Sequence, residues 1–164
     1  MIDQLTDLVK QYAGDAIISN PAIPDERNDE AIGEASQSIF GGLKNAISNG
    51  NLSEVTNMFN SGQSAINSPV TQNIQGDFVK NLMHKFGLDN GKATQIAGAL
   101  IPIVIQKFVH KTNDPNDKSF DLTSILGSLT GNAGGGLNDV LGKFTGGDQQ
   151  AAGGMLDKVK GFFN

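Results

Sequence analysis

The side-chain types that perform catalysis or bind metals are scarce in this chain and are not grouped. It has no cysteine, so disulfides, thiolate metal ligands and cysteine nucleophiles are absent. The two histidines, His84 and His110, do not stand in the HxxxH or HxxE spacing that would place zinc ligands on one helix face. No G-x-S-x-G turn presents a serine nucleophile. We therefore expect a protein without enzymatic activity, without a metal site and without a cofactor.

Two kinds of loop look like ligand-binding loops but lack required residues. Residues 113–121, NDPNDKSFD, alternate side-chain oxygens as a calcium loop does, but no glycine stands at the sixth position and Ile125 replaces the bidentate acid. The glycine-rich run at 131–136 follows no predicted strand, and the Gly-Lys pair at 142–143 precedes Phe144, where a phosphate loop has Ser or Thr. We expect no small-molecule ligand.

Residues 78–96 form a segment whose layout suggests nucleic-acid recognition as an alternative. Two helical stretches flank Gly87, as they do in a helix-turn-helix. The side chains that would then contact the nucleic acid are Lys80, Lys85, Asn90, Lys92, Thr94 and Gln95. A formal net charge of -5 opposes this alternative, and so does the apolar stretch from Leu100 to Val109, most of which we expect inside the protein.

The elements that would position any site are predicted to be helices. Apolar residues recur at helical spacing throughout the chain, and no segment alternates with the period of a strand. Ser68 and Pro69 are typical of a helix start, since Ser can cap the helix and Pro suits its first position. Gly87 suits the end of that helix, and Asp89 can cap the next one. The fold class is therefore predicted to be all-α.

The helix at about residues 90–110 is apolar on nearly every side, so other parts of the protein must bury it. We predict a helical core domain at 1–112 built around this central helix. Pro102 lies within the helix and either kinks it or opens a second helical segment. The residues we expect to be mostly buried are Phe78, Leu82, Phe86, Ile96, Leu100, Ile101 and Val104.

Residues 113–164, the Gly-rich tail, contain an internal repeat of short amphipathic helices. DLTSILGSLTGN begins at Asp121, and GLNDVLGKFTGG begins at Gly136, with apolar stripes offset by 15 positions. Helices this short are marginal in isolation, so each stripe must dock on another surface. The candidate interaction surface consists of Leu122, Ile125, Leu126, Leu129, Leu137, Val140, Leu141, Phe144, Phe162 and Phe163.

One block of the chain resembles a known family. The block holds Phe86-Gly87-Leu88-Asp89, Ala93, Ile96-Ala97, Leu100-Ile101-Pro102 and Val104-Ile105. It resembles the YidB-like family of uncharacterised bacterial proteins over roughly residues 69–110, and the Leu-Gly repeats of the tail fit that family too. The resemblance implies a compact, homeodomain-like helical core. It implies no activity and no catalytic residues.

The tail determines the functional prediction. Short apolar stripes separated by glycines indicate a noncatalytic interaction or scaffold protein, because an apolar stripe that is not used internally marks a partner surface. Self-association is the simplest form, since the same repeat can pack on its own copy. A membrane surface is disfavoured by the tail's few lysines. The alternative is that all stripes pack on the helix at 96–109 within one monomer.

The start of the chain predicts a cytoplasmic location. Met1-Ile2-Asp3 opens with an acid, and no basic segment precedes an apolar run as in a secretion signal. The longest uncharged apolar run, Ile96 to Ile105, is about half as long as a membrane-spanning helix.

Overall fold

The computed structural model describes residues 2–117, 120 and 122–129, and every regular element in this part of the chain is helical. The all-α prediction is confirmed. The α-helices are α1 (Ile2–Tyr12), α2 (Asn28–Ser48), α3 (Leu52–Ser61), α4 (Pro69–Phe86), α5 (Asn90–Thr112) and α6 (Leu122–Leu129). Short turns of other helix types are η1 (Gly14–Ile18), η2 (Asp25–Arg27) and η3 (Gly62–Ala65).

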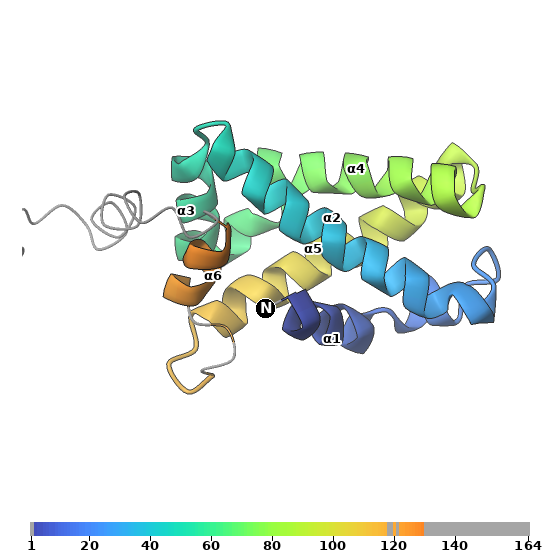
Figure 1. Ribbon diagram of the computed structural model, residues 1–164, viewed down its shortest axis with the longest axis horizontal. Helices are drawn as coiled ribbons and strands as arrows, with labels where there is room; N and C mark the ends of the chain where they lie inside the picture. The colour runs from blue at the N-terminus through green and yellow to red at the C-terminus, as the bar shows by residue number, and fades with distance from the viewer. Residues whose placement is uncertain (1, 118–119, 121, 130–164) are drawn as a thin grey trace, which may run out of the picture. The chain divides into compact units, whose positions relative to one another are not determined.

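Helix α5 is the central element, as predicted. It packs against α4 along much of its length and against α1, α3 and α2 on other sides, so that it runs through the middle of the bundle (Figure 1). Its apolar residues Leu100, Ile101 and Val104 have no exposed surface. By length and composition it could cross a membrane, but 50% of that window is buried inside the protein, as in the core helix of a globular domain.

The predicted local signals at both ends of α4 and at the start of α5 are confirmed. The side chain of Ser68 accepts a hydrogen bond from the backbone N–H of Thr71, which caps α4. Gly87 adopts a left-handed conformation with φ of 65°, which a residue without a Cβ adopts at little cost. Asp89 accepts from the backbone N–H of Lys92 at 2.9 Å and caps α5. These contacts fix the tight α4–α5 turn.

Pro102 does not interrupt α5, which remains one helix from Asn90 to Thr112. Of the two alternatives predicted for Pro102, the structure excludes the one in which it opens a second helical segment. The helix is less completely buried than its composition suggests, because Ile103 is 45% exposed and Lys107 also faces water. The apolar stretch from Leu100 to Val109 therefore has one open face.

Six of the seven predicted core residues are fully buried, and the seventh, Phe86, is mostly covered but keeps some exposed surface. It is the last residue of α4. The guanidinium carbon of Arg27 lies 4.2 Å from the centre of its ring, and the same guanidinium donates to the carbonyl of Lys85. The position therefore joins the end of α4 to the start of α2 by a cation–π contact.

The compact unit continues past the boundary that we place after residue 112. It extends to Gly131, and a second unit comprises residues 132–164. The reason is apolar burial: Phe120, Ile125 and Leu129 are all at most 5% exposed. The ring of Phe120 stands edge-on to Phe108 with centroids 5.5 Å apart. The first tail helix, α6, is thus packed with the core, while the homeodomain-like arrangement stays a prediction.

Candidate functional site

The lysines of the helix-turn-helix alternative are all paired with carboxylates. Lys80 lies 3.3 Å from Asp77, and Lys92 lies 3.5 Å from Asp89. A phosphate must compete with these partners for each ammonium group, so this surface offers little unbalanced positive charge.

The third lysine of that alternative, Lys85, contacts Glu34, whose side chain is only 8% exposed. This ion pair ties α4 to α2, and moving Lys85 to a phosphate would leave a nearly buried carboxylate without its partner. Asn90, Thr94 and Gln95 are exposed at the start of α5. The side-chain oxygen of Asn90 accepts a hydrogen bond from Thr94, so part of this polar surface is used within the helix.

Two carboxyl groups, those of Asp89 and Glu30, have pKa values below their ordinary values. For Asp89 the main cause is the hydrogen bond from the backbone N–H of Lys92. For Glu30 the main cause is its hydrogen bonding with the Arg27 guanidinium. Both carboxylates lie at helix N-termini, where a negative charge interacts favourably with the helix dipole.

Groups that could form a metal site are not brought together in the described part of the chain. No three His, Asp or Glu side chains there lie close enough to hold a metal ion. His84 and His110 are exposed on different helices.

The candidate interaction surface is divided between the two units. Ile125 and Leu129 of the first repeat are each 1% exposed, and α6 packs on α2, so these two side chains are not open to a partner. The side chains of Leu122 and Leu126 lie outside the described residues. So do the remaining members, Leu137, Val140, Leu141, Phe144, Phe162 and Phe163.

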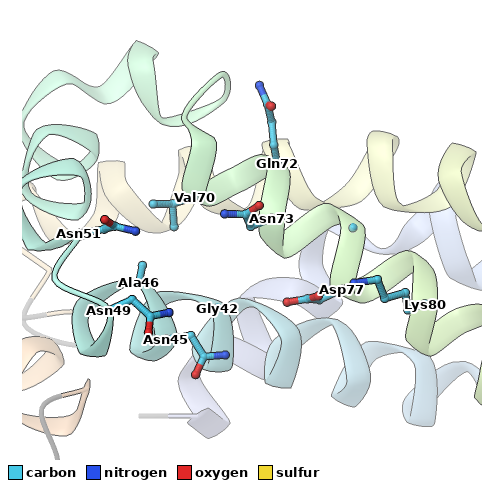
Figure 2. A pocket seen from close by; sticks show the side chains of 11 residues that line it. Gly42, Asn45, Ala46, Asn49, Asn51, Val70, Gln72, Asn73, Asp77 and Lys80 are labelled. Atoms are coloured by element: carbon cyan, nitrogen blue, oxygen red, sulfur yellow. Dashed lines mark hydrogen bonds and ion pairs between the residues drawn. The ribbon is translucent and has the colours of Figure 1, made fainter.

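A polar groove between α2 and α4 was not predicted from the sequence. It has a volume of about 320 Å³ and is lined mainly by side-chain amides and glycines. Asn45 comes from the last turn of α2, and Asn49 and Asn51 follow that helix, while Asn73 and Asp77 extend from α4 (Figure 2). The groove therefore has one amide-bearing wall from each helix.

The two helices approach closely beside this groove because residue 42 is glycine. A Cβ at Gly42 would collide with the side chain of Ile74. On the α4 side, Gly76 lines the groove and has open space where a Cβ would stand. Asn45 lies in the last turn of α2 and Asn49 is its C-cap residue, so the sequence marks them only as polar residues at a helix end. Only the tertiary structure shows that both border a groove against α4.

Comparison with known proteins identifies the family but no activity. A model for a bacterial protein of unknown function, DUF937, matches residues 68–161, which is more than half of the chain. The match begins at the cap of α4, so the helices α1 to α3 that cover α4 and α5 precede it. No curated protein and no solved structure matches the chain. The chain belongs to the DUF937 family of bacterial proteins of unknown function, the YidB family whose features the sequence resembles.

Proposed function

We propose that this protein is a noncatalytic interaction or scaffold protein, and that the later members of its candidate interaction surface, Leu137, Val140, Leu141, Phe144, Phe162 and Phe163, bind the partner. The simplest partner is a second copy of the chain. The observation that carries the proposal is the burial of the first repeat, whose Ile125 and Leu129 lie in the interior of the unit that ends at Gly131. The same apolar stripe recurs in the sequence of residues 132–164.

The first repeat supports this proposal by its chemistry. Helix α6, which carries this apolar stripe, packs on α2, and its Ile125 and Leu129 are buried. Burying one Leu or Phe side chain contributes about 1.5–3 kcal/mol. Leu137, Val140, Leu141 and Phe144 repeat the same spacing, so a similar apolar surface would give them comparable free energy.

A pair of single substitutions in the full chain tests the proposal. Leu141→Asp places a carboxylate in the second stripe, and Asn138→Asp adds the same charge between the stripe positions. We expect light scattering to show self-association of the unaltered chain and of Asn138→Asp, and loss of association in Leu141→Asp. Circular dichroism should show unchanged helix content in the core for both variants.

Two results would contradict the proposal. If the unaltered chain is monomeric at all concentrations and binds no protein, the later stripes are satisfied within one molecule. If both aspartate variants associate as strongly as the unaltered chain, the second stripe is not the contact surface. The nucleic-acid alternative receives no support from the paired lysines described above, and we do not propose it.

A further inference from the structure

We propose that the open side of α5 is the surface on which the second repeat of another copy of this chain docks. The receiving surface, here named the α5 face, consists of Ala99, Pro102, Ile103 and Gln106. The docking segment is the repeat GLNDVLGKFTGG, which begins at Gly136. This inference rests on the proposed function and names the surface that the second apolar stripe contacts.

The α5 face is an uncovered, mainly apolar strip on the central helix. Its members recur at helical spacing, so they lie on one side of α5. Ile103 is 45% exposed, the largest fraction among the large apolar side chains that are exposed in the described residues. Ala99 is exposed as well, whereas Leu100 and Val104 on the other sides of the helix are buried. An apolar strip of this kind is typical of a contact surface.

The shape of the α5 face suits an approaching helix. Ala99 has a short side chain, and a Cβ added at the neighbouring Gly98 would meet nothing within 4 Å. Ile103, one turn after Ala99, projects from this low surface and can insert between side chains of a second helix. A helix that docks in this way presents anchors at i, i+3, i+4 and i+7. The second repeat has that spacing in Leu137, Val140, Leu141 and Phe144.

The first repeat shows which side of the second repeat can be buried. Two stripe residues of α6 are buried, while its Ser124 and Ser128 are exposed. Asp139 and Lys143 stand 15 positions after these two serines in the aligned repeat. As a helix, the second repeat therefore has its charges on the side that α6 exposes, and its apolar side is uncharged. Because α6 already occupies its place on α2, the second repeat needs a different surface.

Charge distinguishes the second repeat from other segments of a second copy. Helix α5 carries three lysines and no acidic residue, and Lys107 follows Ile103 by one turn. Two α5 faces in contact would bring these cations together without an acid to balance them, which is unfavourable. The segment at 155–163 carries two lysines against one acid and would add to the positive charge. The uncharged side of the second repeat avoids both problems.

Reciprocal docking gives a closed dimer. Each copy has one α5 face and one second repeat, so two copies can exchange their repeats about a two-fold axis. This arrangement covers both apolar surfaces of both copies and leaves no contact open for a third. We therefore expect the associated form to be a dimer.

Two variants of the full chain each remove one half of the contact. Ile103→Asp places a carboxylate on the α5 face, and Leu141→Asp places one in the second stripe. Burying an unpaired carboxylate in an apolar contact is very costly, so each variant alone should be monomeric in light scattering. Their equimolar mixture should associate at concentrations at which each variant alone is monomeric. The intact repeat of the Ile103→Asp chain can bind the intact α5 face of the Leu141→Asp chain.

Matched controls separate the α5 face from general effects of the substitution. Ala99→Glu adds a carboxylate to the same face and should also abolish association, whereas Ile103→Leu keeps the face apolar and should associate. Ile2→Asp places the same carboxylate at another exposed isoleucine, which is 38% exposed in α1, and should associate like the unaltered chain. Melting curves should confirm that all these surface variants are folded.

Three outcomes would overturn the inference. If Ile103→Asp and Ala99→Glu associate like the unaltered chain while Leu141→Asp is monomeric, the second stripe contacts another surface and the proposed function stands. If the mixture of Ile103→Asp and Leu141→Asp stays monomeric, the stripe and the α5 face do not contact each other. If the unaltered chain is itself monomeric, both proposals fail, and lower stability of Ile103→Asp would then place the repeat on α5 within one molecule.

Discussion

Replacing Leu129 by alanine tests whether the first tail repeat belongs to the core. Leu129 is 1% exposed in α6, so its truncation removes buried carbon atoms and leaves space behind. A buried Leu→Ala change costs about 2–5 kcal/mol in unfolding free energy. Helix α6 is the last described element of its unit and can shift to fill part of the space. We therefore expect a value in the lower part of this range, about 2–3 kcal/mol.

The measurement is urea unfolding of the full chain followed by circular dichroism at low protein concentration, where association does not add to stability. With a slope of about 2 kcal/mol per molar urea, the transition midpoint should fall by about 1–1.5 M. A change in the slope itself would indicate altered compactness rather than lost packing.

Phe144→Ala is the matched control, because Phe144 occupies the position of Leu129 in the second repeat, 15 residues later. It lies in residues 132–164, outside the unit that contains α6. We expect the core transition of this variant to stay within about 0.3 M urea of the unaltered chain. If Leu129→Ala changes the midpoint no more than Phe144→Ala does, α6 does not stabilise the core and the reasoning is refuted.

Three further predictions concern single positions. Gly42→Ala should lower the unfolding free energy by about 1–3 kcal/mol in calorimetry, because its Cβ would collide with Ile74. Gly41→Ala, with open space at the neighbouring position of α2, should not lower it. Ser68→Ala removes the α4 cap and should cost about 1 kcal/mol in urea unfolding, while an unchanged midpoint would disprove the role of the cap. Because folding lowers the pKa of Asp89, its carboxylate stabilises the protein above about pH 4, and this contribution is lost as the pH falls through the lowered pKa. Asp89→Asn, which keeps a good capping residue, should lose less stability than the unaltered chain in acid unfolding, and identical acid transitions would contradict this.

The helix boundaries around the α4–α5 turn could be predicted because their causes are local. Ser68 and Asp89 cap helices through backbone groups three residues away, and Gly87 is needed for one left-handed conformation. Short-range contacts of this kind depend on adjacent residue types alone. The same is true of the burial of α5, since an almost wholly apolar helix needs cover from other elements.

Burial at the margins of the core could not be predicted in this way. Phe86 continues the apolar stripe of α4 but lies at the end of that helix, where it keeps some exposed surface. Part of its cover is the guanidinium of Arg27, 59 residues earlier in the chain. Ile125 and Leu129 have the same stripe pattern as the second repeat. Because both repeats have the same apolar pattern, the pattern does not predict which of them packs on α2. That depends on the path of the chain in the folded protein.

The polar groove between α2 and α4 could be found only in the tertiary structure. Asn49 and Asn73 are 24 residues apart, and each alone looks like an ordinary surface asparagine. They line one groove because α2 and α4 cross at Gly42, where the absence of a side chain permits close approach to Ile74. The sequence by itself determined the helices, their caps, the central helix and the family. The tertiary structure decided which polar side chains face one another and where the core ends, because both depend on contacts between residues far apart in the chain.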